Sequence, residues 1–440
     1  MKKLTFFLAC LIPAILFAQP NKSYLIKTGK LFDSESAQFK SGLDILVARG
    51  HIEDVKPDAS VTDEERKKYT LIDLSAYTVM PGLIDAHTHL LYKEGNLGDT
   101  ENASTLALEK HLTMDGDAWR ALYGAARAKG YLESGITSVE DLGNSGLYGD
   151  IALRKAIAEN LVPGPNMSCA GPGLAAAGAQ LPGLSYADQS LVNREYRVIS
   201  GVTDAIQAVR EHINQGVNVI KLYSDNRPNR TKLSVEEMRA VVDEAHRYRV
   251  HVAAHATTFE SVHNAVLAGV DVIEHGYNVA DSTLMLMAQK HIALVPTDGD
   301  RASMVDLLKT KMKDTTRMNI NVNNARKRSI DRLQRAVKFG VTIAYGSDDY
   351  GDSNKPFGEP SKHTLIGYHE AGLPITQVLQ IATRNSAQVV GWGKYLGILK
   401  KDYLPDIIAV DNSIEKDMNA ILNVRFVMKA GTIYKTPDKP

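Results

Sequence analysis

Eight short apolar runs alternate with segments of helical periodicity between residues 81 and 390, and this alternation restricts the possible fold more than any other feature. Such runs are typical of buried parallel strands, and the amphipathic segments between them are typical of crossover helices. The predicted strands are 83–89, 136–140, 166–170, 217–223, 250–255, 270–275, 292–296 and 341–346. The predicted helices include 117–133, 202–215 and 235–248, the last with a Ser234 cap and Glu237 three residues on.

This strand count predicts an α/β fold, specifically a (β/α)₈ TIM-like barrel over residues 81–395. A doubly wound open sheet is the alternative, but no glycine-rich phosphate loop follows the first predicted strand. The longest loop-like stretch, 171–196, is rich in glycine and alanine and is either a lid or disordered.

Strand-and-turn patterns occupy both ends of the chain. Residues 22–80 contain strand-like runs separated by glycines, and similar runs return at 406–410 and 424–428. Because chain ends commonly lie close together, both ends can contribute to one unit. We therefore predict a small β-sandwich-like domain built from 19–80 and 396–440.

The first 18 residues have the pattern of a secretory signal peptide. Two lysines precede an apolar run from Leu4 to Phe17, which Pro13 interrupts and which is too short to span a bilayer, and Ala18 offers a cleavage point. A lipoprotein site at Cys10 fits less well, because apolar residues continue for seven positions beyond it. The expected location is secreted or periplasmic, with no membrane association after the signal is removed.

Charge and cysteine content narrow the possible partners. The 51 basic and 51 acidic residues balance, and loss of two lysines with the signal leaves a mature charge of −2. Nothing in this balance favours nucleic acid, so the expected partner is a small-molecule substrate; a homo-oligomer is one possibility. Only Cys169 remains after cleavage, so no intrachain disulfide can form, and Cys169 is interpreted as a small core residue.

Polar side chains that suit metal binding occur at the ends of five predicted strands. His87 and His89 are two residues apart on a strand, so their imidazoles point the same way and form half of a metal site. His255 and His275 each end a later strand, and Asp348 follows the eighth. Active sites of such barrels lie at this end of the strands, so these side chains are expected to converge.

Lys221 lies in the apolar run 217–223, where a buried ammonium is costly unless it is neutralised or paired. Carboxylation by CO₂ would turn this lysine into an anionic ligand that can bridge two metals. The alternative is that the lysine reaches the barrel mouth or pairs with a carboxylate. The side chain of His251 is predicted to point to the same side of the strand as that of His255, but His251 lies near the start of the strand, at the end opposite to the expected site. We therefore interpret His251 as structural, as we do Asp271, His246 and His263. Asp349 competes with Asp348 for the functional role.

Together these motifs resemble the amidohydrolase superfamily. They comprise Pro81 to His89, Lys221, His255, Glu274-His275-Gly276, Gly346-Ser347-Asp348, and the segments Ala371 to Leu373, Ala382 to Ala387 and Val427 to Gly431. Within the superfamily the pattern is most similar to the imidazolonepropionase-related branch, which includes metal-dependent Xaa-Pro and Xaa-Arg dipeptidases. The stretch 396–406, which usually carries Gly-x-x-Ala-Asp, matches only at Asp406.

The resemblance implies a role for each ligand. His87 and His89 would hold the more buried of two divalent metal ions, zinc being expected, and His255 and His275 the more exposed one. A carboxylated Lys221 would bridge both ions. Asp348 would bind metal, take the proton from a bridging water as that water attacks, and pass the proton to the leaving amine.

The leading functional hypothesis is a binuclear hydrolase that cleaves an amide-type C–N bond in a dipeptide, an N-acyl amino acid or a cyclic amide. Tyr223 is two residues from Lys221, so its side chain is predicted to point to the same side of the strand and can contact the substrate. Arg227 or Arg230 can bind a carboxylate through two hydrogen bonds. The loop 224–232 lacks the glycine pair common among the peptidases. The alternatives are a mononuclear deaminase of a cyclic base and a non-catalytic metal-containing binding protein.

Overall fold

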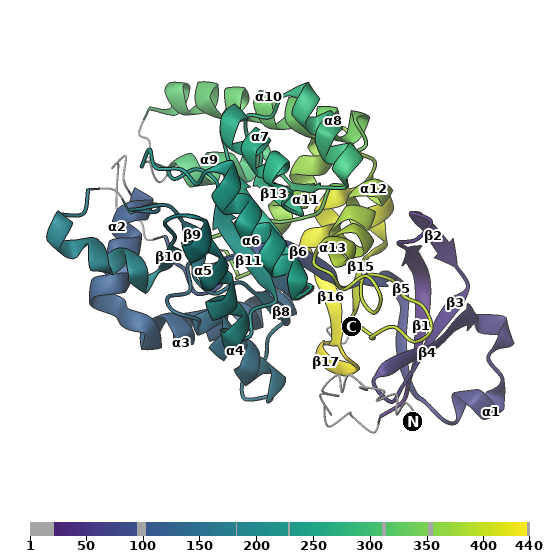
Figure 1. The fold of residues 1–440 in the computed structure, drawn as a ribbon. Helices are drawn as coiled ribbons and strands as arrows, with labels where there is room; N and C mark the ends of the chain where they lie inside the picture. The colour runs from purple at the N-terminus through teal and green to yellow at the C-terminus, as the bar shows by residue number, and fades with distance from the viewer. Residues whose placement is uncertain are drawn as a thin grey trace, which may run out of the picture.

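The computed structural model describes residues 22–94, 103–181, 183–227, 229–309, 314–350 and 355–437 (Figure 1). The predicted signal peptide, with Cys10, lies outside these residues. No helix within the described ranges is both long and apolar enough to cross a membrane.

One eight-stranded sheet combines both ends of the chain. Its strands run in the order β17-β16-β15-β5-β1-β3-β4, with β2 paired to β1, and Figure 1 shows the purple and yellow strands on the same side of the molecule. The strands are β1 (Tyr24–Asp33), β2 (Gln38–Ser41), β3 (Leu43–Ala48), β4 (His51–Pro57), β5 (Thr70–Pro81), β15 (Ile407–Asp411), β16 (Val424–Lys429) and β17 (Thr432–Lys435). The pairing of Ile407 with Pro81 joins the C-terminal strands to the N-terminal ones.

Side-chain alternation along this sheet supplies two different cores. On β15, Ile407 and Ala409 pack with Ile26 and Ile45 of the N-terminal strands. Ile408, between them, packs into the core of the α/β body instead. Successive strand residues point to opposite faces, so one buried strand can hold the sheet against the rest of the protein.

The α/β body contains parallel strands in two sheets, as the strand–helix alternation predicts. A three-stranded sheet has the order β6-β7-β8, and a six-stranded sheet has the order β10-β9-β11-β12-β13-β14. The strands are β6 (Leu83–Thr88), β7 (Ile136–Asp141), β8 (Asn166–Cys169), β9 (Gly173–Ala175), β10 (Tyr196–Val198), β11 (Val219–Tyr223), β12 (His251–Ala256), β13 (Val272–His275) and β14 (Ala293–Val295).

Backbone hydrogen bonds connect the edges of these two sheets. The Asn218 amide donates to Cys169 O at 2.9 Å, and the Leu294 amide donates to Thr342 O at 2.9 Å. The Ala86 amide donates to Tyr345 O at 2.7 Å. The run 341–346 therefore lies between β14 and β6. We predicted a strand over these residues, but the run forms only an isolated bridge between Leu294 and Ile343.

Helices follow most of the parallel strands. The helices are α1 (Asp63–Arg66), α2 (Ala103–Lys110), α3 (Gly116–Glu133), α4 (Gly149–Ala158), α5 (Val202–Gln215), α6 (Val235–Arg247), α7 (Phe259–Ala268), α8 (Asp281–Lys290), α9 (Arg301–Lys309), α10 (Thr315–Lys338), α11 (Glu359–Glu370), α12 (Ile375–Gln380) and α13 (Ser386–Val389). The predicted capping box of α6 is confirmed: the Ser234 hydroxyl accepts from the Glu237 amide, and the Glu237 carboxylate accepts from the Ser234 amide.

Short helical turns complete the element order. The 3₁₀ turns are η1 (Asp58–Ser60), η3 (Tyr186–Arg194), η5 (Asn412–Glu415) and η6 (Met418–Leu422), and the π-helical turns are η2 (His111–Asp115) and η4 (Ile381–Asn385).

The described parts of the stretch 171–196, residues 171–181 and 183–196, form defined elements, in contrast to the disorder that was one of the two alternatives from the sequence. The stretch contains β9 and η3, and the buried Glu195 at its end pairs with Arg120 of α3 at 2.8 Å. Asn229 donates to the carbonyls of Gly178 and Ala179, which ties this stretch to the loop after β11. These contacts hold the two loops together above the carboxyl end of β11.

Candidate metal centre and active site

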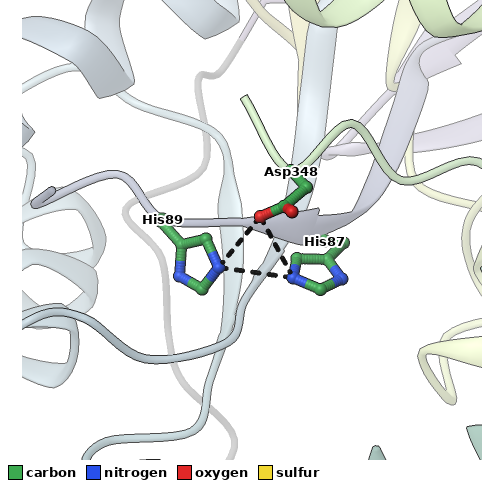
Figure 2. A group of neighbouring side chains, drawn as sticks. All are labelled: His87, His89 and Asp348. Atoms are coloured by element: carbon green, nitrogen blue, oxygen red, sulfur yellow. Dashed lines mark hydrogen bonds and ion pairs between the residues drawn. The ribbon is translucent and has the colours of Figure 1, made fainter. Parts of the chain in front are cut away.

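His87 and His89 present their Nε2 atoms to one another because each ring is tethered through Nδ1. His87 Nδ1 lies 2.5 Å from Glu274 Oε2, and His89 Nδ1 lies 2.9 Å from the carbonyl of Gly143. These acceptors require a proton on each Nδ1, which leaves each Nε2 with a free lone pair. The two Nε2 atoms are 3.3 Å apart (Figure 2).

Asp348 completes a group of three ligand atoms. Its Oδ1 lies 3.5 Å from His87 Nε2 and 3.2 Å from His89 Nε2, and the three atoms fall within 4.8 Å of one another. Figure 2 shows the carboxylate approaching from a separate loop above the two rings. The backbone of Asp348 is in the left-handed region, with φ 52°, and the backbone amide of Asp348 donates to the His87 carbonyl at 2.9 Å. Such unfavourable backbone conformations cluster at functional sites.

Gly346 allows this loop to approach β6. A Cβ at this position would lie 2.3 Å from Val295 Cγ1 and 2.7 Å from His87 Cβ, so no larger residue fits without movement. A glycine here therefore determines how closely Asp348 can approach the two histidines.

His275 and His255 extend the group. The ring centroids are 5.1 Å apart for His87 and His275, and 4.7 Å apart for His275 and His255. His275 Nδ1 is 2.8 Å from Thr297 Oγ1 and 3.9 Å from Asp348 Oδ2. His255 Nε2 is buried without a hydrogen-bond partner among the described residues. Burial lowers the pKa values of His87, His255 and His275, so these imidazoles favour the neutral, ligating form.

Lys221 is buried beside these rings and is only 1% exposed. Its Nζ lies 5.5 Å from the centroid of the Tyr223 ring, and it forms no hydrogen bond or ion pair with another described residue. Burial lowers its pKa, while Glu274 and Asp348 oppose that shift. Lys221 lines the cavity, and no carboxylate among the described residues forms an ion pair with it.

The donor set suits a divalent transition metal. Imidazole nitrogen and carboxylate oxygen are the common zinc ligands, and here they converge in a buried site with an unsatisfied imidazole nitrogen on His255. His87, His89 and Asp348 would hold one ion. His255, His275 and Lys221 line the same cavity beside this group.

All the candidate site residues line one cavity of about 730 Å³. Its lining comprises His87, His89, Tyr92, Leu108, Asn144, Gln180, Tyr196, Lys221, Tyr223, Arg227, Asn229, Arg230, His255, Thr257, His275, Tyr277, Asp348 and Tyr350. Tyr223 is buried beside the His255 ring, with centroids 5.1 Å apart. Arg227 is largely exposed, and its Nε lies 3.6 Å from Asp225 Oδ2. A cavity of this size suits a small-molecule substrate.

Asp349 points away from this group. Oδ2 of Asp349 lies 3.2 Å from Arg127 Nη2 and accepts a hydrogen bond from the Tyr131 hydroxyl at 3.1 Å. The Asp349 carboxylate therefore forms an ion pair with the buried Arg127. Asp348 is therefore the carboxylate that faces the histidines.

The three histidines that we interpreted as structural have partners outside the candidate site. His251 Nε2 lies 2.9 Å from Glu140 Oε2, and His246 Nε2 lies 2.8 Å from Asp271 Oδ2. His263 Nδ1 lies 3.2 Å from Thr283 Oγ1.

Sequence reasoning missed two sets of residues. Glu274, which contacts His87, entered only as part of a motif, although a carboxylate in an otherwise apolar strand could have indicated its role. Four further tyrosines, Tyr92, Tyr196, Tyr277 and Tyr350, line the cavity beside Tyr223. They come from loops and strand ends with no shared spacing, so no sequence pattern connects them.

Comparison with known proteins places this chain in a family. Residues 78–436 match the sequence model of the Amidohydrolase family, and the chain belongs to it. It is accordingly a metal-binding hydrolase that acts on carbon–nitrogen bonds.

Characterised relatives resemble most of the chain. Ochratoxinase from Aspergillus niger is 28% identical over 400 residues, covering 84% of this chain and 79% of the relative. Imidazolonepropionase from Chromobacterium violaceum is 24% identical over 400 residues, covering 84% and 85%. The crystal structure of a Xaa-Pro dipeptidase with methionine in its active site superimposes with a TM-score of 0.79 and 26% identity, covering 94% of this chain and 100% of the other. The predicted superfamily is confirmed.

Proposed function

We propose that the protein is a binuclear metal-dependent hydrolase of small amides that carry a free carboxylate, such as dipeptides or N-acyl amino acids; a cyclic amide is a further candidate. The convergence of His87, His89 and Asp348 within 4.8 Å, in the cavity that Lys221, His255 and His275 also line, carries this proposal. Relatives named ochratoxinase and Xaa-Pro dipeptidase support an amide as the substrate.

When bound, the metal ions would lower the pKa of water and polarise the substrate carbonyl. Asp348, with Oδ1 beside the two Nε2 atoms, is positioned to accept one proton of that water. The water oxygen bonds to the carbonyl carbon, the C–N bond breaks, and Asp348 returns the proton to the departing nitrogen. The products are a carboxylic acid and an amine, and transfer of the acid's proton to the amine gives a carboxylate and an ammonium ion, with no oxidant or reductant required.

The second metal and the carboxylated Lys221 belong to the proposal. Lys221 is buried without a direct anionic partner among the described residues, and carboxylation would replace its unfavourable buried ammonium with an anion that metals stabilise. His255 and His275 supply imidazoles on the same side of the cavity. We propose zinc as the metal, because the donors are nitrogen and oxygen atoms.

Tyr223 and Arg227 are the proposed contacts for the substrate carboxylate. Both line the cavity, Tyr223 lies beside His255, and a guanidinium can bind a carboxylate through two hydrogen bonds.

We also propose that the parallel strands close into a (β/α)₈ barrel and that both chain ends form a sandwich-like domain over 19–80 and 396–440. The backbone hydrogen bonds at Asn218, Leu294 and Ala86, which join the two parallel sheets, support closure. Secretion after cleavage near Ala18 is proposed from the sequence alone.

The test measures metal content and hydrolysis of a dipeptide and N-acyl amino acid panel by zinc-loaded protein. Lys221→Ala is expected to lower metal content from two ions to one per chain, and Asp348→Ala to abolish turnover. His246→Gln, at an exposed histidine paired with Asp271, is the matched control and is expected to retain both properties.

Full metal content and full activity in Lys221→Ala and Asp348→Ala would overturn the proposal. Ammonia release from a cyclic base with one metal per chain would favour a mononuclear deaminase instead. Metal binding without turnover of any amide would favour a binding protein.

A further inference from the structure

The buried guanidinium of Arg127 contacts the two chain segments that carry His89 and Asp348. Arg127 lies on α3 and is 1% exposed. Its Nη1 donates to the His89 carbonyl at 3.2 Å and to the Tyr92 carbonyl at 2.9 Å. Its Nη2 donates to the carbonyl of Asp349, the residue after Asp348. One side chain on a separate helix therefore connects the backbone at or next to two of the three candidate ligands.

Two neighbours fix the orientation of this guanidinium. Oδ2 of Asp349 lies 3.2 Å from Nη2 of Arg127 and accepts a hydrogen bond from the Tyr131 hydroxyl at 3.1 Å. The Tyr131 ring lies one turn further along α3, and its centroid is 5.6 Å from the guanidinium carbon. A guanidinium is planar and its donors have fixed directions, so a guanidinium held in this way also fixes the carbonyls that it contacts.

The His89 segment lies just beyond the strand ladder. β6 ends at Thr88, so His89 is the first residue whose backbone is not part of the strand. The Tyr92 amide donates to the His89 carbonyl at 3.1 Å and closes a turn, and Arg127 contacts the carbonyls of both residues. Arg127 therefore supports the backbone of His89 where strand pairing ends.

The Asp348 segment is held on both sides of the ligand. The left-handed backbone of Asp348 is unfavourable for a residue other than glycine and persists only where the surroundings impose it. On one side, the Ser347 hydroxyl donates to Asp85 Oδ2 on β6 at 2.6 Å. On the other side, Asp349 contacts Arg127 through both its carbonyl and its carboxylate. Loss of Arg127 would remove the support on this second side.

We propose that Arg127 is a positioning residue, which sets the distance between the ligand atoms of His89 and Asp348 and so determines metal affinity without contacting the metal. These atoms, His89 Nε2 and Asp348 Oδ1, lie 3.2 Å apart and come from separate segments (Figure 2). Zinc–ligand distances vary by only about 0.2 Å, so a small movement of either segment weakens binding. The inference rests on the proposed metal centre and adds to it a residue that does not line the cavity.

Arg127→Lys tests this role, with zinc affinity measured by competition with a chromophoric chelator. Lysine keeps the positive charge beside Asp349, but a single ammonium replaces the planar group that reaches both segments. Zinc affinity is expected to fall about tenfold to a hundredfold, as it does when a group that orients a metal ligand is lost. The measurement requires no turnover, so it is independent of the reaction that the protein catalyses.

Arg326→Lys is the matched control. Arg326 is a buried arginine whose Nη1 donates to the Gly299 carbonyl at 3.0 Å. Its Nη2 donates to the Gly367 carbonyl at 3.1 Å and to the Glu370 carboxylate at 3.0 Å. These partners are of the same kinds as those of Arg127, and none of them is a candidate metal ligand. The control is expected to lower the urea midpoint as Arg127→Lys does, but to keep zinc affinity within about twofold of the unmodified protein.

Asp349→Ala provides a second variant in which the arginine remains. It removes the carboxylate that fixes the guanidinium, whereas the contact of Arg127 with the backbone carbonyl of residue 349 can persist. Zinc affinity is therefore expected to fall by about threefold to tenfold. In the double variant, the combined loss is expected to be smaller than the product of the two single losses, because both changes remove the same contact.

Zinc affinity in Arg127→Lys that equals that of the unmodified protein, or that falls no further than in Arg326→Lys, overturns the inference. Single losses that multiply fully in the double variant overturn it as well. If Arg127→Lys does not fold, Asp349→Ala decides: unchanged zinc affinity overturns the inference, and a loss of about threefold or more supports it. Weakened zinc binding in variants of a protein that cleaves no amide supports the inference and refutes only the proposed reaction.

Discussion

Oε2 of Glu274 lies 2.5 Å from Nδ1 of His87, and this contact turns the other nitrogen of the ring toward His89 and Asp348. Glu274 is fully buried on β13, next to His275, so its position depends on the pairing of parallel strands. Partners of this kind set the tautomer and basicity of a metal-ligating histidine.

Glu274→Gln is expected to weaken zinc binding about tenfold to a hundredfold, because an amide cannot stabilise the Nδ1 proton as a carboxylate does. Competition with a chromophoric chelator measures the affinity. Glu140→Gln is the matched control, since Glu140 is also a buried glutamate bonded to a histidine, His251, that is not a ligand candidate. Equal zinc affinity in Glu274→Gln and the unmodified protein would contradict the assigned role.

Metal loading is expected to depend on bicarbonate if Lys221 is carboxylated. The neutral amine attacks CO₂, a C–N bond forms, and one proton leaves to solvent, so loading in CO₂-depleted buffer should give about half the zinc content. Elemental analysis of the reloaded apoprotein gives the stoichiometry. Lys221→Gln should show no response to bicarbonate, and an equally unresponsive unmodified protein would argue against carboxylation.

Gly346→Ala is expected to displace the Asp348 loop from β6, because the new Cβ would meet Val295 and His87. Overpacking of this kind costs about 1–3 kcal/mol, and here it also separates the ligands, so zinc affinity and turnover should both fall. Gly391→Ala is the control: Gly391 has φ 80° and open space around its Cβ position, so strain alone should lower stability without changing zinc affinity. Normal zinc affinity in Gly346→Ala would show that the loop can adjust.

Asp406, whose side chain contacts none of the candidate metal ligands, is expected to make the free energy of unfolding depend on pH. Burial raises its pKa to about 6, although the Ala430 amide and Asn166 both donate to it. The folded state therefore holds this proton more tightly than the unfolded state. The contribution of Asp406 to the free energy of unfolding is greatest below about pH 4. It is lost as the pH rises through 6, which lowers the free energy of unfolding by about 3 kcal/mol.

Asp406→Asn removes that titration, so the difference in unfolding midpoint between variant and unmodified protein should change across pH 4–6 and stay constant above it. Urea unfolding at a series of pH values measures this difference. A difference that does not vary with pH would show that Asp406 titrates alike in both states.

Local patterns were sufficient for most of the parallel strands and for the residue types of the site. The alternation of apolar runs predicted the parallel strands, the Ser234–Glu237 pair predicted the start of α6, and strand parity predicted that His87 and His89 face the same way. These features depend on neighbours within a few positions along the chain, so they can be inferred without the fold.

Contacts between distant segments were decided by the tertiary structure. The Glu274–His87 contact, the ion pair that removes Asp349 from the site, and the tyrosines around the cavity each join segments far apart in the sequence. The structured stretch 171–196 likewise depends on Arg120 and Asn229, which lie on other elements. The sequence alone determined which side chains are available for metal chemistry; only packing of the strands determined which of them meet, because that depends on relative strand position and loop conformation.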